Sequence, residues 1–212
     1  MTPFRSISGV AAPFLEDDVN TDQIAPAAGH NLTPDYAAML FQSRRDGDTN
    51  DDNAAFVLNR PRFRSARLLV TGDNFGCGSS RETAVWSMAA FGIRCIVARG
   101  FADTYRENCL KNGVLPVVLA KKDAAEFEAL VVDNDGRDAF TADLETQTIA
   151  APGGRVFAFD IPADERTLLL EGLDDIGLTE RHEADIAAWE ARTGRDQPWL
   201  QKLRRSASTK ID

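Results

Sequence analysis

The order of apolar and polar positions predicts strands alternating with helices over the middle of the chain. Short apolar runs predict strands at 68–71, 95–98 and 115–119, and helical patterns follow them at 81–91, 101–111 and 123–132. This alternation is typical of a parallel sheet joined by crossover helices. Upstream, the pattern predicts a short strand at 8–14, a polar loop at 16–23 and a short helix at 35–42.

The last third of the chain has a different pattern. Short alternating runs at 140–144, 147–150 and 155–160 predict a β-meander. Helices are expected at 162–170 and 179–192, the second turning Ile186 and Trp189 toward the core. The very polar segment at about 43–55 predicts a mobile surface loop. No internal repeat or linker divides the chain, so we expect one domain over 1–212.

The strongest chemical signal lies in the loop between the strand at 68–71 and the next helix. Residues 76–82 read GCGSSRE. Glycines let a ligand approach the backbone, a helix N-terminus attracts anions, and Arg81 offers a planar pair of donors for a carboxylate. We interpret the segment as an anion-binding active-site loop.

A purely structural alternative fits the same residues. Ser79 and Glu82 have the spacing of a capping box, in which they would only satisfy the free N–H groups of the helix. The density of glycine, serine and arginine exceeds what a cap requires. The loop matches neither the P-loop pattern nor the dinucleotide-binding glycine pattern.

Composition and charge limit the classes of function. The 212 residues are 43% hydrophobic and 27% charged, and no apolar run is long enough to cross a membrane. With 24 basic and 33 acidic residues the net charge is −9 and no basic stripe forms, which argues against nucleic-acid binding. The first residues lack the pattern of a secretory signal, so we expect a cytoplasmic protein.

The cysteines indicate a reduced chain without a metal site of its own. Cys77, Cys95 and Cys109 fit neither a disulfide framework nor a metal knuckle. Cys95 lies in a predicted strand and Cys109 on the apolar stripe of a predicted helix, so both are expected in the core. We therefore expect no metal and no cofactor bound by this chain alone.

Four segments of the chain, in order, carry a family resemblance. They are 20–24 (NTDQI), 76–82 (GCGSSRE), 100–119 with GFAD and NCLKNGVLPVVL, and 172–179 (GLDDIGLT). These resemble the swivel domain of the aconitase superfamily, in the form found in small subunits of 3-isopropylmalate dehydratase. The resemblance covers about residues 9–190. It implies an α/β fold, a three-layer β/β/α swivelling domain.

The resemblance also implies a function and a partner. Its members are part of a heterodimeric hydro-lyase of leucine biosynthesis, which interconverts 2-isopropylmalate and 3-isopropylmalate by dehydration and rehydration. The 4Fe–4S cluster that serves as Lewis acid belongs to a separate large subunit, so this chain would supply the base and part of a dicarboxylate site. Ser79 corresponds to the proton-abstracting serine and Asp22 to an aspartate of the site. Arg81 corresponds to a carboxylate binder, with Gly78 and Ser80 as further substrate-binding positions.

Two departures from the family pattern leave the substrate open. Thr83 stands where a histidine is usual. The loop at 25–33 corresponds to the family's substrate-discriminating segment, and the resemblance implies substrate contacts at Ala28, Gly29 and His30. This loop departs from the basic and aromatic residues that the family usually has there. A related malate, of the methylmalate or dimethylmalate type, is therefore an alternative substrate.

No arginine lies between Asp22 and Gln42, which argues against a third carboxylate on the substrate.

Other classes of function are also compatible with parts of the pattern. A non-catalytic carboxylate-binding assembly module would use the same loop without turnover. A phosphate-using enzyme is disfavoured, because the loop has no P-loop lysine beside it.

Overall fold

The computed structural model describes residues 1–26, 34–45 and 56–199. They divide into two compact units, Met1–Gly172 and Leu173–Asp212. The first contains both sheets, and the described part of the second, up to residue 199, is helical.

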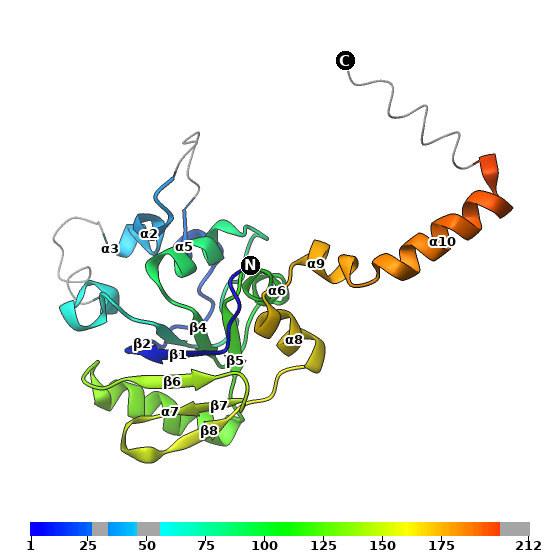
Figure 1. Ribbon diagram of the computed structural model, residues 1–212. Coiled ribbons are helices and arrows are strands. Elements are labelled where there is room, and N and C mark those ends of the chain that lie inside the picture. The colour runs from blue at the N-terminus through cyan, green and yellow to red at the C-terminus, as the bar shows by residue number, and fades with distance from the viewer. Residues whose placement is uncertain (27–33, 46–55, 200–212) are drawn as a thin grey trace. The chain divides into compact units, whose positions relative to one another are not determined.

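The first unit contains two four-stranded sheets (Figure 1). The parallel sheet has the order β2 (Ala11–Phe14), β3 (Leu68–Thr71), β4 (Cys95–Ala98) and β5 (Leu115–Val118). The antiparallel sheet has the order β1 (Ser6–Gly9), β6 (Phe140–Asp143), β7 (Thr148–Ala150) and β8 (Val156–Ala158). The predicted parallel sheet and β-meander are both confirmed.

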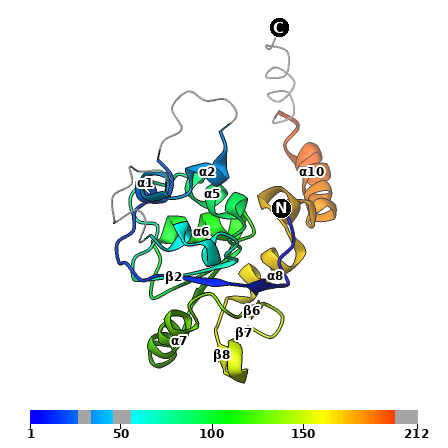
Figure 2. The same ribbon diagram turned by 90° about the vertical axis from the view of Figure 1, so that its left-hand side faces the viewer.

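Both faces of the parallel sheet are buried, because successive side chains of each strand point to opposite sides. Leu69 and Ile96 pack in one cluster with side chains of α5 (Thr83–Phe91) and α6 (Asp103–Lys111). Leu68 and Val97 pack in a second cluster with side chains of the antiparallel sheet, α7 (Lys121–Asn134) and α8 (Ala163–Glu171). Figures 1 and 2 show α2 and α5 on one side of β2, and β6, β8 and α7 on the other. The three-layer β/β/α architecture is thus confirmed.

Short helices complete the first unit. They are α1 (Thr21–Ile24), α2 (Tyr36–Met39), α3 (Gln42–Arg45) and the 3-10 turns Val57–Asn59, Pro61–Phe63 and Pro152–Gly154. Of the polar loop expected at about 43–55, residues 46–55 lie outside the described residues, and 43–45 belong to α3.

Several predicted boundaries are wrong. The strand expected at 8–14 is two strands, because the chain leaves β1 in one sheet and enters β2 in the other. The loop expected at 16–23 ends in helix α1. The helix expected at 81–91 begins at Thr83, and the helix expected at 101–111 begins at Asp103.

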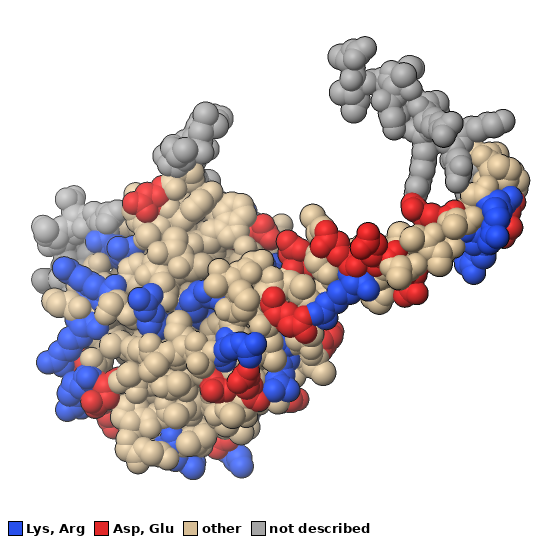
Figure 3. Space-filling model, viewed as in Figure 1, with Lys and Arg blue, Asp and Glu red and all other residues tan. Residues whose placement is uncertain are grey.

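The second unit is helical, with α9 (Asp175–Glu180) and α10 (Glu183–Asp196). The prediction of a single helix at 179–192 is therefore wrong. Ile186 and Trp189 are 39% and 50% exposed, so the prediction that they face the core is wrong as well. Acidic side chains gather along the visible face of these helices (Figure 3). In the described parts of both units, no helix combines the length and the apolar character that crossing a membrane would need.

Candidate active site

The glycine-rich loop lies where the carboxyl ends of neighbouring parallel strands meet. It follows β3, and its backbone is held by the segments that follow β2 and β4. The Thr21 N–H donates to the Cys77 carbonyl at 2.8 Å, and the Phe75 N–H donates to the Gly100 carbonyl at 3.0 Å. This edge of an open α/β sheet is where such folds place their ligands.

Gly76 allows the loop to pass directly over helix α6. Its φ is +81°, a left-handed conformation that glycine adopts without strain. A Cβ at this position would overlap the ring of Tyr105, which is 2% exposed. The buried tyrosine therefore forms the base on which the loop rests.

Helix α1 brings a second set of polar side chains to the loop. Asn20 and Gln23 form a capping box, each side chain accepting from the other residue's backbone N–H at 2.9 Å. The cap begins the helix at Thr21 and fixes Asp22 in its first turn. The Thr21 residue is 1% exposed, whereas the side chain of Asp22 is 72% exposed.

A polar network joins the loop to α1. The Ser79 Oγ accepts a hydrogen bond from the Arg81 Nε at 2.7 Å and lies 3.1 Å from the Thr21 Oγ1. The Arg81 guanidinium also forms an ion pair with Asp22. The structure therefore brings Ser79, Arg81 and Asp22 together, as the sequence analysis expects, and adds Thr21.

The neighbouring loop residues are open to solvent. Gly78, Ser79 and Ser80 are all exposed, and the φ of Gly78 is +100°. The carbonyl of Ser80 accepts from the Asn108 side chain at 3.2 Å, which ties the loop to α6. The predicted substrate contacts at 28–30 lie outside the described residues.

The capping alternative for Ser79 is wrong in this structure. Helix α5 begins at Thr83, four residues beyond Ser79, and the flanking Glu82 makes no side-chain cap hydrogen bond. The Ser79 hydroxyl is instead shared between Thr21 and Arg81. The N-terminus of α5 is thus displaced from Ser79, and the positive group that contacts the serine is the guanidinium.

The cysteines of the chain are poorly suited to hold a cluster. Cys95 and Cys109 are buried in the core as expected, and burial raises the pKa of both thiols. Protonated, enclosed thiols are poor iron ligands. Cys77 is half-buried, with its Sγ 3.4 Å from the Asp18 carbonyl. Over the described residues, no three His, Cys, Asp or Glu side chains are grouped as a metal site.

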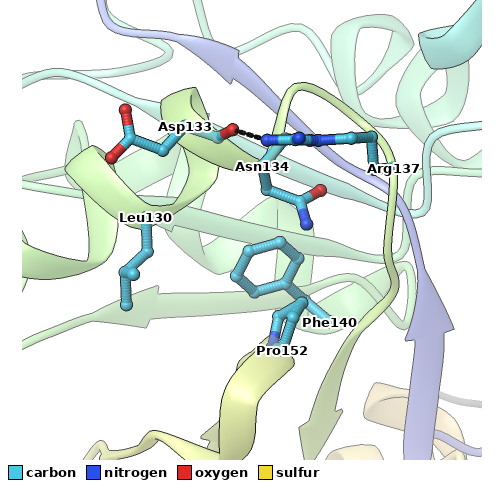
Figure 4. A pocket seen from close by; sticks show the side chains of 6 residues that line it. All are labelled: Leu130, Asp133, Asn134, Arg137, Phe140 and Pro152. Carbon is cyan, nitrogen blue, oxygen red and sulfur yellow. Dashed lines mark hydrogen bonds between the residues drawn. The ribbon is translucent and has the colours of Figure 1, made fainter.

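A pocket of about 180 Å³ opens elsewhere in the first unit, at the end of α7 (Figure 4). Its lining residues are Leu130, Asp133, Asn134, Arg137, Phe140 and Pro152. The Arg137 guanidinium is turned onto the backbone, donating through Nε to the Asn134 carbonyl at 2.9 Å and through a second nitrogen to the Asp133 carbonyl. The pocket is a weaker candidate than the loop, because its arginine is bound to the backbone and its lining has no serine, cysteine or histidine.

Sequence reasoning missed two residues of the site. Thr21 lies next to Asp22 in the NTDQI segment, but its contact with Ser79 spans 58 positions of sequence. Asn108, which binds the Ser80 carbonyl, sits in the NCLKNG segment and is 8% exposed. A polar residue at a buried position of a helix was the signal available for Asn108.

Comparisons with known proteins establish the family. The model of the aconitase C-terminal domain matches residues 1–122. A small subunit of 3-isopropylmalate dehydratase from Rhodospirillum centenum is 44% identical over 201 residues, covering 94% of this chain and 98% of the relative. The chain belongs to the 3-isopropylmalate dehydratase small subunit family.

Further comparisons agree with this membership. The model of the C-terminal domain of the 3-isopropylmalate dehydratase small subunit matches residues 175–202, within the helical second unit. The small subunit of Xanthobacter autotrophicus is 45% identical over 204 residues, covering 94% of this chain and 100% of the relative. A crystal structure of 3-isopropylmalate dehydratase from Methanocaldococcus jannaschii has a TM-score of 0.59 at 23% identity, covering 86% of this chain and 98% of that one, and supports the fold alone.

Proposed function

We propose that this chain is the small subunit of a heteromeric hydro-lyase that interconverts 2-isopropylmalate and 3-isopropylmalate in leucine biosynthesis. Family membership supports the reaction and the need for a large partner protein. The observation that carries the proposal is the contact of the Ser79 Oγ with the Arg81 Nε at 2.7 Å, in a loop exposed at the sheet edge.

Ser79 is the proposed base of the reaction. Dehydration removes a weakly acidic proton from the carbon beside a carboxylate, and a free serine hydroxyl is a very weak base. The Arg81 Nε–H stabilises the alkoxide form of Ser79, because a charged donor forms a short hydrogen bond with an anionic oxygen. Asp22 fixes the guanidinium plane through its ion pair.

Arg81 is the proposed carboxylate binder as well. Its Nε and one Nη2 proton contact Ser79 and Asp22, which leaves further N–H donors of the fork for a substrate carboxylate. The exposed Gly78 and Ser80 lie next to this position in the loop and are proposed substrate contacts. Residues 28–30 keep the same proposed role from the family pattern.

The 4Fe–4S cluster is proposed to belong to the large subunit. The thiols of this chain do not fit a cluster, because Cys95 and Cys109 are enclosed in the core. The cytoplasm is the proposed compartment, since all three cysteines are unpaired and a reducing compartment keeps them so.

The test is Ser79→Ala in the complex with the large subunit. We expect kcat to fall by roughly 10²- to 10⁴-fold, the range of a positioned base, with KM nearly unchanged. The assay follows the ultraviolet absorbance of the unsaturated intermediate with 3-isopropylmalate, methylmalate and dimethylmalate in parallel. Wild-type-like turnover in the variant would refute the role of Ser79. Carboxylate binding without turnover in every wild-type complex would instead support the assembly module.

A further inference from the structure

We infer that Thr21 is a positioning residue for Ser79, whose hydroxyl donates to the Ser79 oxygen when that oxygen becomes an alkoxide. The inference rests on the proposed function, since it concerns the same base. It assigns a role to a side chain of α1 that lies 58 positions away in sequence.

The hydrogen-bond count at Thr21 supports this direction of donation. The Thr21 Oγ1 accepts from the Ser79 backbone N–H at 3.1 Å, so one of its lone pairs is occupied. The same oxygen lies 3.1 Å from the Ser79 Oγ, and its own proton is available for that contact. A deprotonated Ser79 has no proton to give, so in that state only Thr21 can be the donor.

The Ser79 oxygen would then be held by two donors of different kinds. The Arg81 Nε–H reaches it at 2.7 Å, and the Thr21 hydroxyl reaches it from α1. These two bonds use two of the three lone pairs of the alkoxide, which leaves the third lone pair to accept the substrate proton. The oxygen is left to face the exposed side, where a substrate proton would approach.

The fold holds the Thr21 hydroxyl in one place. The residue is 1% exposed, its backbone N–H donates to the Cys77 carbonyl at 2.8 Å, and the Asn20–Gln23 capping box fixes the turn that carries it. A β-branched side chain has few rotamers available, so the hydroxyl is preorganised without further cost. A solvent-exposed serine or water would have to be ordered at each turnover.

A threonine that only tied the two segments together would behave differently on substitution. A structural tie would affect the melting temperature and the amount of complex. A donor to the alkoxide would affect the chemical step, because its hydrogen bond is stronger in the transition state than in the ground state. The two roles are therefore separable by kinetics.

The experiment compares Thr21→Val with Thr21→Ser in the assembled complex. Valine keeps the shape and removes the hydroxyl, whereas serine keeps the hydroxyl. We expect Thr21→Val to lower kcat roughly ten- to a hundredfold with KM within twofold, and Thr21→Ser to restore kcat to within about threefold. Thr71→Val is the matched control, since Thr71 is also 1% exposed but its hydroxyl donates to the Glu16 carbonyl.

Two results would overturn the inference. One is an unchanged kcat in Thr21→Val. The other is an equal loss in Thr21→Ser and Thr21→Val, because serine keeps the hydroxyl and the loss in the valine variant could then not be assigned to the missing donor. If the valine variant fails to assemble, Thr21→Ala and Thr21→Ser replace the pair, because both lack the methyl group and only serine has the hydroxyl.

Ser79→Ala in the same assay separates this inference from the proposed function. If that variant keeps its turnover, the proposed base is wrong. If it loses turnover while Thr21→Val does not, only the role of Thr21 fails. In the double variant, Thr21→Val should add nothing to the loss caused by Ser79→Ala, and a further tenfold loss would show that Thr21 acts elsewhere.

Discussion

Replacing Arg81 with lysine keeps the positive charge of the site and removes its planar fork of donors. In the structure the Arg81 Nε contacts Ser79 at 2.7 Å while another nitrogen of the same group pairs with Asp22. A lysine has its three donors on one nitrogen at the end of a flexible stem, so it does not reproduce two donors held apart in one plane. The variant therefore tests whether the geometry of the guanidinium, rather than its charge, serves the reaction.

The expected loss follows from the contacts that disappear. A hydrogen bond to a charged partner contributes about 1.5–3 kcal/mol, and the bond from Arg81 to a Ser79 alkoxide belongs at the upper end. About 3 kcal/mol corresponds to roughly a hundredfold lower kcat. If a substrate carboxylate loses one further bond of about 1.5 kcal/mol, KM rises roughly tenfold. Simple dicarboxylates that compete with the substrate should also inhibit the variant more weakly than the wild type.

The stability of the fold should change little. The side chains of Arg81 and Asp22 are 30% and 72% exposed, and such exposed ion pairs contribute about 0–1 kcal/mol. A Tm decrease of at most about 4 °C is expected. The kinetic assay is steady-state turnover of the complex, with Arg5→Lys at the exposed Arg5–Glu145 pair as the control. A kcat within threefold of the wild type would refute the geometric argument, and a raised KM alone would limit Arg81 to substrate binding.

Three further predictions follow from the structure. Gly76→Ala should lower the free energy of unfolding by about 2–5 kcal/mol, because of the left-handed φ and the overlap with Tyr105. Gly153→Ala, with a similar φ and no neighbouring atom, should show only the loss caused by the φ, and thermal denaturation compares the two variants. Burial raises the pKa of the Cys95 and Cys109 thiols above their ordinary 9.0, so the contribution of these thiols to stability is complete below about pH 9 and falls above it, by up to about 1.4 kcal/mol per pH unit and thiol. Chemical denaturation across pH should therefore show a shallower fall in stability for the double alanine variant, and an equal fall would contradict the prediction. The chain purified alone, after anaerobic reconstitution, should be colourless and contain no stoichiometric iron, and an iron–sulfur spectrum would place the cluster here.

The sequence predicts the parallel sheet and the meander well, because their strands are local apolar runs. Strands β3 and β4 begin and end as expected. The division of 8–14 into β1 and β2 depends on pairing with strands far along the chain, Leu68–Thr71 and Phe140–Asp143, and no local pattern records which sheet a strand joins. The exposure of Ile186 and Trp189 has a similar cause, since an apolar stripe shows which face is apolar but not whether anything covers it.

The candidate site shows the same division between local and long-range information. The glycine-rich loop and its arginine are visible in the sequence, and the family resemblance adds Asp22. The sequence predicts the start of α5 too early, because the Ser79–Glu82 spacing resembles a capping box. In the structure Ser79 contacts Thr21 instead and does not cap the helix. Tertiary hydrogen bonds here override a local signal worth only about 1 kcal/mol.

The exposure of the loop bears on why such a site would need a partner. A serine alkoxide is stabilised by Arg81 far more strongly in a dry, low-dielectric site than in water. In this chain the residues around that contact, Gly78 to Ser80, are exposed, so solvent competes for the contact between Arg81 and Ser79. Covering the loop with a second protein surface would exclude that water and strengthen the contacts of Ser79 with Arg81 and Thr21 without moving them. On the function proposed above, the base would be preorganised on the small subunit, and a large partner would complete the site by closing over it.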